Sequence, residues 1–218
     1  MEAFITGTHS GIGRAIAMKF LKEGHAVTGF DIREASIVHE NYRHFIGDVR
    51  DPATYPQGLK PHILINNAGV QDGGNDIDVN LKGVIGITEK YAFGNENLKA
   101  VVMIGSASAH TGSEFPEYAA SKGGLLAYTK NVANRIAPRA TCNSIDPGGV
   151  RTPLNAPVME DPILWQRIMD LTPLKRWAEP EEIAEWVYFV AAVNRFMTGQ
   201  NLLIDGGEAG MTTFVWPE

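Results

Sequence analysis

The sequence predicts an α/β protein built on a doubly wound parallel sheet of about seven strands, with helices on both faces. Short apolar segments recur along the 218 residues and are separated by longer amphipathic stretches. This alternation is typical of a parallel sheet that is covered on both sides. No repeat, linker or charge block interrupts it, so residues 1–218 are predicted to form a single domain. The predicted strands are AFIT (3–6), AVTGFD (26–31), HFIGDV (44–49), HILINN (62–67), AVVMIGS (100–106), TCNSID (141–146) and NLLIDGG (201–207).

The first predicted strand is followed by a glycine-rich turn and then by an amphipathic helix. Gly7, Gly11 and Gly13 remove side chains where the backbone turns tightly and where a pyrophosphate would approach the helix N-terminus. A glycine triplet between a strand and a helix, at the start of an alternating chain, indicates a dinucleotide site.

The second predicted strand ends in Asp31. A carboxylate at this position would accept hydrogen bonds from an adenosine ribose and repel a 2′-phosphate, which favours NAD over NADP. His9 and Arg33 would reduce that repulsion. The alternative is that Asp31 is only a turn residue at the end of a strand.

Two connections are predicted to be unusually short. RDPATYPQGLKP (50–61) is rich in proline and leaves little room for a crossover helix, and VQDGGNDIDV (70–79) is short and glycine-rich. We expect this shortening, after Asp48 and after Gly69, to open the adenine side of the site and to weaken cofactor binding.

The stretch YAASK (118–122) places a phenol and an ammonium four residues apart. On a helix, Tyr118 and Lys122 would lie on the same face, and a fixed positive charge there would favour the phenolate. Taken alone, the five residues also fit a chance pair on a solvated helix.

The motifs follow one another in a fixed order: TGTHSGIG (6–13), DV (48–49), NNAG (66–69), VNLKG (79–83), IGSAS (104–108), YAASK (118–122), DPGGVRTP (146–153) and TGQNLLIDGG (198–207). In this order, over essentially the whole chain, the sequence resembles the short-chain dehydrogenase/reductase family. The resemblance implies a Rossmann fold and an NAD(H)-dependent oxidoreductase that interconverts a secondary alcohol and a ketone.

The resemblance also implies a catalytic set of Ser106, Tyr118, Lys122 and Asn80. Tyr118 would be the general acid in reduction and the general base in oxidation. Lys122 would favour the phenolate and bind the nicotinamide ribose, and Asn80 would hold a water that relays protons, although a buried asparagine in an irregular helix also fits. Ser106 would bind the substrate oxygen. Strand alternation puts Ser108 on the same side, but Ser106 directly follows the strand and is preferred.

Cofactor contacts implied by the resemblance run along the whole chain. Asp48 would reach the adenine by a hydrogen bond and Val49 by contact, whereas Thr152 would bind the nicotinamide amide. The complete predicted set is Gly7, His9, Ser10, Gly11, Ile12, Gly13, Asp31, Asp48, Val49, Asn67, Ala68, Gly69, Tyr118, Lys122, Pro147, Gly148, Val150 and Thr152.

Residues 153–180 are where the family keeps a mobile lid over the substrate. Apolar residues of this segment would either line a pocket or form the buried face of a lid helix: Leu154, Met159, Leu164, Trp165, Ile168 and Met169. Glu114 is a candidate polar contact to substrate or a solvated loop charge. The closing MTTFVWPE (211–218) is apolar and would suit burial at a subunit interface of a homodimer or homotetramer.

Composition argues against several other classes of protein. The formal net charge is −6 and no Lys/Arg cluster stands out, which argues against a nucleic-acid or anionic-membrane partner. No apolar run is long enough for a membrane span, no signal peptide opens the chain, and the cytoplasm is the predicted compartment. The six histidines lack metal-ligand spacing, so no metal is expected, and Cys142 is predicted to be a buried core residue.

Three other functions fit the sequence less well. A catalytically silent NAD(P)-binding regulatory or scaffold protein would have no need of Tyr118. A sugar-nucleotide epimerase or dehydratase would usually carry a longer C-terminal substrate domain. Divergent enoyl reductases separate the tyrosine and the lysine more widely than this chain does. The favoured partner is therefore a small-molecule alcohol or ketone.

Overall fold

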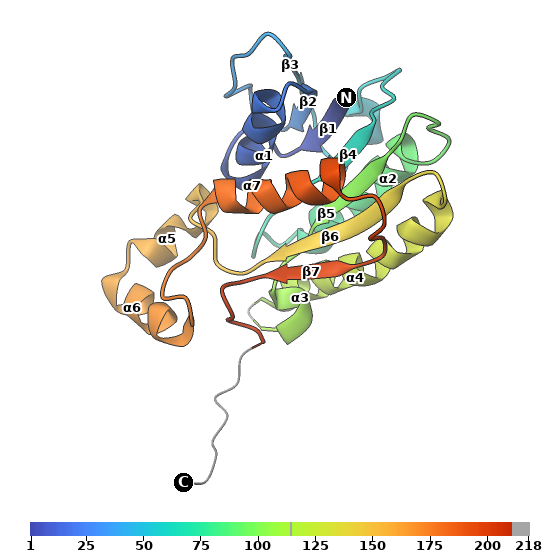
Figure 1. The fold of residues 1–218 in the computed structure, drawn as a ribbon. Coiled ribbons are helices and arrows are strands. Elements are labelled where there is room, and N and C mark those ends of the chain that lie inside the picture. The colour runs from blue at the N-terminus through green and yellow to red at the C-terminus, as the bar shows by residue number, and fades with distance from the viewer. Residues whose placement is uncertain (114, 211–218) are drawn as a thin grey trace.

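Seven parallel strands form one sheet, in the order β3-β2-β1-β4-β5-β6-β7 (Figure 1). The computed structural model describes residues 1–113 and 115–210. The strands are β1 (Glu2–Thr6), β2 (Ala26–Asp31), β3 (Tyr42–Ile46), β4 (Ile63–Asn66), β5 (Ala100–Ile104), β6 (Thr141–Pro147) and β7 (Asn201–Ile204). The order reverses between β1 and β4, and a crevice at the carboxyl ends of the strands is expected at such a switch point.

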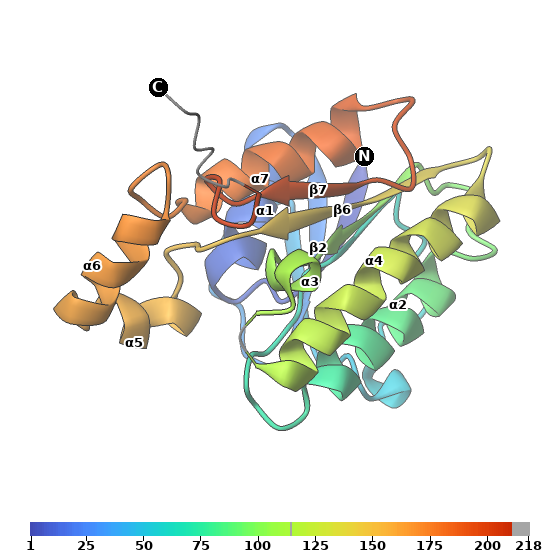
Figure 2. The ribbon, with the colours of Figure 1, turned by 90° about the horizontal axis from the view of Figure 1, so that it is seen from below.

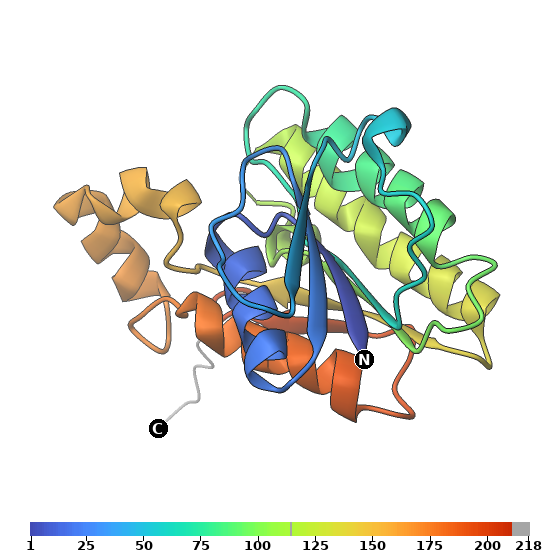
Figure 3. The ribbon, with the colours of Figure 1, turned by 90° about the horizontal axis from the view of Figure 1, so that it is seen from above.

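Helices cover both faces of this sheet, which confirms the predicted fold class (Figures 2 and 3). The α-helices are α1 (Gly11–Lys22), α2 (Val84–Tyr91), α3 (Ser108–Thr111), α4 (Pro116–Ile136), α5 (Ala156–Met159), α6 (Pro162–Leu171) and α7 (Pro180–Tyr188). Two short 3-10 helices, η1 (Pro52–Thr54) and η3 (Pro153–Asn155), and two π-helices, η2 (Asp78–Gly83) and η4 (Phe189–Val193), complete the list.

Two hydrophobic cores follow from the alternation of side chains along the strands. In β1, Ile5 packs into the core beneath α1 and α7, whereas its neighbour Phe4 packs into the core beneath α2 and α4. Both side chains are fully buried. Cys142 lies in the second core, and its burial raises the pKa of the thiol, as expected of a core residue rather than a reactive one.

The connection between β3 and β4 contains only the 3-10 helix η1, which confirms that it is short. The connection between β2 and β3, residues 32–41, also lacks a helix, which we had not predicted. Ile32 and Ile46 are consequently 67% and 61% exposed beside the edge strand β3. The sheet is therefore thinly covered next to the strand that ends in Asp31.

Residues 153–180 form η3, α5 and α6, which project from the carboxyl ends of the strands (Figure 1). Asp161 caps α6 by accepting hydrogen bonds from the N–H groups of Ile163 and Leu164. Trp165 of α6 packs edge-on against Trp177, with 5.0 Å between ring centroids. That this segment moves as a lid remains a prediction.

Two negative findings apply to residues 1–113 and 115–210. Their helices include no apolar segment long enough to cross a membrane. Their His, Cys, Asp and Glu side chains form no cluster of three that could hold a metal ion.

Candidate active site

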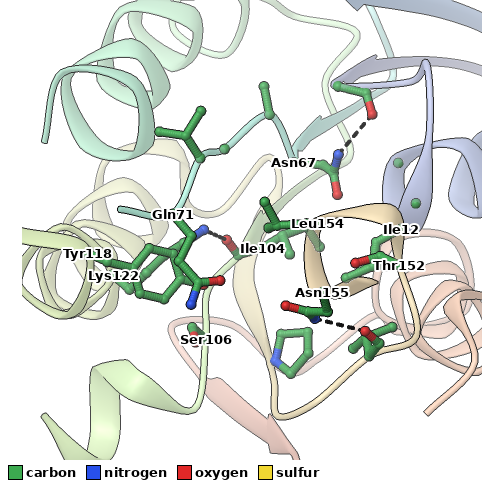
Figure 4. Close-up of a pocket in the computed structure, with 18 of the residues that line it drawn as sticks. Ile12, Asn67, Gln71, Ile104, Ser106, Tyr118, Lys122, Thr152, Leu154 and Asn155 are labelled. Atoms are coloured by element: carbon green, nitrogen blue, oxygen red, sulfur yellow. Dashed lines mark hydrogen bonds between the residues drawn. The ribbon is translucent and has the colours of Figure 1, made fainter. Parts of the chain in front are cut away.

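A cavity of about 1000 Å³ opens at the carboxyl ends of the central strands (Figure 4). Most residues of the predicted cofactor set line it: Gly7, Ser10, Gly11, Ile12, Gly13, Asp31, Asp48, Val49, Asn67, Ala68, Gly69, Tyr118, Lys122, Pro147, Gly148, Val150 and Thr152. His9 does not line it; instead its backbone N–H donates to Asp31.

The glycine-rich turn is packed so closely that it has no room for larger side chains. A Cβ atom at Gly7, where φ is +76°, would lie 2.7 Å from Asn67 Nδ2 and 2.9 Å from Ala68 Cα. A Cβ atom at Gly13 would overlap the carbonyl oxygen of Gly7. Asn67 Nδ2 fixes the turn by donating to the carbonyl oxygens of Thr6 and Gly7 at 3.0 and 3.1 Å. This cradle at the N-terminus of α1 fits a pyrophosphate.

Asp31 lies at one end of the cavity with its carboxylate held by the backbone. Its Oδ2 accepts from the N–H of His9 at 2.9 Å and its Oδ1 from the N–H of Arg33 at 3.0 Å. The guanidinium of Arg33 lies 3.3 Å from Ser10 Oγ, so a positive charge also reaches this end of the cavity. The site therefore presents a fixed carboxylate beside an exposed cation.

Asp48 is already paired, which the sequence did not indicate. Both of its oxygens lie 3.0 Å from Arg50 Nε, and Oδ2 lies 2.6 Å from Arg50 Nη2. The guanidinium holds the pKa of the Asp48 carboxyl below its usual value. An adenine amino group that donates to Asp48 would have to share this carboxylate with Arg50.

Tyr118 and Lys122 lie on one face of α4, at the cavity wall (Figure 4). Lys122 Nζ is 5.7 Å from the centroid of the Tyr118 ring and donates to the carbonyl oxygen of Ile104 at 2.9 Å. Burial lowers the pKa of Lys122 to about 8, and the negative charges of Asp146 and Asp76 oppose this shift. A buried ammonium that donates one hydrogen bond to protein can still donate to a ligand, because Lys carries three donors.

Ser106 and Ser108 both line the cavity, but the argument from strand alternation was wrong. Strand β5 ends at Ile104, so both serines lie beyond it, and Ser108 begins α3. The N–H of Ser108 donates to Ser106 Oγ at 3.2 Å, and the two hydroxyl oxygens are also 3.2 Å apart. The turn, rather than the strand, brings the two hydroxyl groups together.

Asn80 lies in the π-helix η2, which supports the interpretation of a buried asparagine in an irregular helix. Its Oδ1 accepts from the N–H of Val70 at 2.8 Å, and its Nδ2 donates to Val70 O at 2.9 Å and to Ser121 Oγ at 3.1 Å. Asn80 does not line the cavity. Its contribution to a proton relay remains a prediction.

The cavity also contains polar residues that sequence reasoning missed. Glu208, which follows β7, accepts from Thr172 Oγ1 at 2.6 Å and from Trp177 Nε1 at 3.2 Å, and so ties the segment after β7 to the end of α6. Gln71 and Asn155 come from loops on opposite walls (Figure 4). Loop residues such as these carry no periodic signal in the sequence.

The predicted lid residues divide between the two interpretations that the sequence left open. Leu154, Leu164 and Ile168 line the cavity, whereas Met159, Trp165 and Met169 do not. Glu114 and residues 211–218 lie outside the described residues, and the predictions about them are untested.

Comparison with known proteins gives the family. The family model described as Enoyl-(Acyl carrier protein) reductase matches residues 7–209. A 3-oxoacyl-[acyl-carrier-protein] reductase FabG from Thermotoga maritima is 30% identical over 237 residues, which cover 93% of this chain and 95% of the relative. The structure of 4-hydroxyisoleucine dehydrogenase complexed with NADH superposes with a TM-score of 0.88 at 27% identity, covering 97% of this chain and 99% of that one. A putative 2-deoxy-d-gluconate 3-dehydrogenase from Agrobacterium tumefaciens with bound NADP has a TM-score of 0.87 at 27% identity, covering 96% of each chain.

With the ordered motifs, the sheet and the cavity, these matches show that the chain belongs to the short-chain dehydrogenase/reductase family. The chain is an oxidoreductase that acts on CH–OH groups with a nicotinamide cofactor and a small-molecule substrate.

Proposed function

We propose that this enzyme interconverts a secondary alcohol and a ketone with NAD(H), using Tyr118 as its general acid and base. The observation that supports this most directly is that Tyr118, Lys122 and Ser106 line the same cavity as the glycine-rich cradle for a pyrophosphate. A bound nicotinamide supplies or accepts the hydride. The residues of this chain would then bind the substrate oxygen and move one proton.

In reduction, the Tyr118 hydroxyl would donate its proton to the oxygen of the former carbonyl, and in oxidation the phenolate would take that proton back. A free phenol has a pKa near 10 and is a weak base at neutral pH. The ammonium of Lys122, 5.7 Å from the Tyr118 ring, would favour the phenolate. Ser106 would donate a hydrogen bond to the substrate oxygen and hold it in reach of the phenol.

Asp31 supports the proposal of NAD rather than NADP. Its carboxylate is fixed by two backbone N–H groups and lines the same cavity, where it would meet the adenosine ribose. A 2′-phosphate would meet this negative charge. Arg33 is the residue that would favour the opposite choice.

The substrate end of the cavity combines apolar and polar side chains. Leu154, Leu164 and Ile168 offer apolar contact, whereas Gln71 and Glu208 offer polar groups. A small ketone or alcohol with both an apolar part and a polar group fits this lining.

A turnover assay tests the proposed function. Purified protein is incubated with NADH or NAD and a panel of small ketones and secondary alcohols, and the absorbance of the reduced nicotinamide is followed. Tyr118→Phe is expected to lower turnover by about 10²-fold or more and to leave NADH binding unchanged.

Tyr128→Phe, on the same helix but away from the cavity lining, is the matched control and is expected to retain turnover. A Tyr118→Phe variant that keeps more than a tenth of the wild-type rate would contradict the assignment of the acid. NADH binding without turnover on any substrate would instead favour a catalytically silent binder.

A further inference from the structure

Asp146 is a carboxylate buried in the protein interior that the proposed mechanism does not use. It lies near the end of β6 and its side chain has no exposed surface. His110 Nε2 lies 2.7 Å from Asp146 Oδ2. Asp146 Oδ1 is also buried and has no hydrogen-bond partner among the described residues. A carboxylate is costly to bury in this way, so its presence calls for a compensating interaction.

The carboxylate lies on the side of the sheet that carries Lys122. Side chains alternate along β6, and Cys142, four residues before Asp146, packs into the core beneath α2 and α4. A Cβ atom at Gly105 would overlap Asp146 Oδ1, so the carboxylate packs directly against the backbone of Gly105.

Gly105 separates two residues that hold the active-site groups. Ile104 accepts the hydrogen bond from Lys122 Nζ, and Ser106 is the candidate ligand of the substrate oxygen. The Asp146 carboxylate therefore lies against the one residue between these two. The same geometry explains the glycine, because any side chain at position 105 would displace Asp146.

The charged and titratable groups around this carboxylate come from a few elements. Helix α3 contributes His110 and α4 contributes Lys122, and Asp76, from the segment before η2, also acts on Lys122. On β6 itself Ser144 is a neutral hydroxyl, and β7 places the apolar Leu203 beside Asp146. Burial raises the pKa of the Asp146 carboxyl, whereas His110, Ser144 and Lys122 lower it.

We propose that Asp146, anchored by His110, is a positioning residue whose negative charge keeps the buried ammonium of Lys122 protonated in the active site. Its catalytic consequence rests on the proposed function, but its effect on Lys122 does not. Removing the carboxylate charge destabilises the protonated forms of both Lys122 and Tyr118, because an anion favours every nearby positive or neutral acid over its conjugate base. Reduction needs both groups protonated, so its rate falls as the pH rises. Without the Asp146 charge, this alkaline fall should begin at a lower pH.

The first test measures the Lys122 titration directly and needs no substrate. Protein labelled with ¹³C at lysine Cε is titrated by NMR, and the Lys122 signal is assigned with Lys122→Met. In Asp146→Asn we expect the pKa of Lys122 to fall by about one pH unit. Asp146→Ser, which is smaller and also neutral, replaces it if the asparagine variant does not fold.

The second test follows the rate of ketone reduction as a function of pH. In Asp146→Asn the alkaline fall in kcat is expected about one pH unit lower than in the wild-type enzyme. His110→Gln, which can still donate to the carboxylate, is expected to keep the wild-type profile. If Asp146 acted only through packing, its substitution would lower kcat equally at every pH and would not change the pH at which kcat falls.

The matched control is Asp78→Asn, which removes a carboxylate at a surface pair with Lys82 away from the cavity lining. It should leave the Lys122 titration unchanged. A folded Asp146→Asn or Asp146→Ser protein with the wild-type Lys122 titration would overturn the proposal, as would an equal shift in Asp78→Asn. If the wild-type protein turns over no substrate, the proposed function fails. The NMR titration still tests whether Asp146 keeps Lys122 protonated.

Discussion

Asn80 and Lys122 approach the same glycine, Gly69. A Cβ atom at Gly69 would lie 3.1 Å from Asn80 Oδ1 and 3.6 Å from Lys122 Nζ. Because Gly69 has no side chain, the buried amide oxygen and the buried ammonium both approach the position that its Cβ atom would take. Asn80 also donates directly to Ser121 Oγ of α4 at 3.1 Å, so the π-helix η2 is tied to the helix that carries Tyr118.

Gly69→Ala is expected to lower kcat about tenfold or more with little loss of stability. The backbone at Gly69 does not need the left-handed region, so the added methyl group acts by crowding Asn80 rather than by strain. Turnover and thermal unfolding are measured on the same preparation. Gly123→Ala, whose Cβ meets open space on α4, is the control and should keep turnover and gain up to about 1 kcal/mol of stability. Equal turnover rates in Gly69→Ala and Gly123→Ala would show that the position of Asn80 does not affect catalysis.

Lys122→Met should change how stability depends on pH. The pKa of Lys122 is lowered by burial from 10.5 to about 8, so between these two values the unfolded chain binds more protons than the folded protein. This group therefore makes the wild-type protein more stable as pH rises through that window, by at most about 1.4 kcal/mol per pH unit. The difference between wild type and Lys122→Met in urea unfolding, followed from pH 7 to above the window, should show this rise. A constant difference across the range would contradict it.

Cofactor choice is expected to depend on Asp31. Thermal unfolding is followed while the protein is titrated with NADH and, in parallel, with NADPH, because ligand at about a hundredfold over its Kd adds roughly 2.7 kcal/mol. We expect a preference for NADH of tenfold or more, which corresponds to about 1.4 kcal/mol. Asp31→Asn should reduce the ratio of the affinities for NADH and NADPH, whereas Arg33→Ala should leave the preference for NADH in place. Stronger stabilisation by NADPH would mean that Arg33 outweighs the carboxylate.

Thr172→Val should loosen the lid segment without changing cofactor affinity. The substitution removes the 2.6 Å hydrogen bond between Thr172 and Glu208 and keeps the shape of the side chain. We expect KM for the substrate to rise severalfold while the Kd of NADH stays the same. Gln166→Ala breaks only a surface pair with Asp170 on α6 and serves as the control. If KM is unchanged in Thr172→Val, Glu208 has no part in holding the substrate end closed.

The short connections around β3 predict weak cofactor binding. Neither residues 32–41 nor residues 47–62 form an α-helix, and Ile32 and Ile46 are left exposed near the end of the cavity where Asp31 lies. We expect the Kd of NADH, measured by calorimetry, to be weaker than micromolar. Micromolar or tighter binding would show that the absence of α-helices from these two connections does not weaken cofactor binding.

Hydrophobic pattern and turn residues were sufficient to predict the sheet. The segment AVTGFD is β2 without a change of boundary, because a buried parallel strand is a continuous apolar run that ends at a polar residue. The end of β5 was placed too late, and the argument about Ser106 and Ser108 failed with it. The boundaries of such elements depend on backbone pairing across the sheet, which one strand's sequence does not contain.

Contacts between distant segments were the part of the site that could not be predicted. Asp146 ends one predicted strand and His110 follows another, but only the pairing of β5 with β6 and the turn into α3 bring them together. Glu208 meets Thr172 for a similar reason, because the segment after β7 reaches the residue that directly follows α6. Neither pair has a sequence spacing that would indicate contact.

The π-helical turn at Asp78–Gly83 makes this protein sensitive to a kind of change that point substitution does not sample. Asn80 bonds both backbone groups of Val70 because η2 is wound more widely than an α-helix. Deleting one residue within this turn would restore α-helical winding and rotate every preceding side chain by about 100° relative to α2. Asn80 would then leave Val70 and Ser121 together, so the length of this turn is as much a part of the site as the identity of its asparagine.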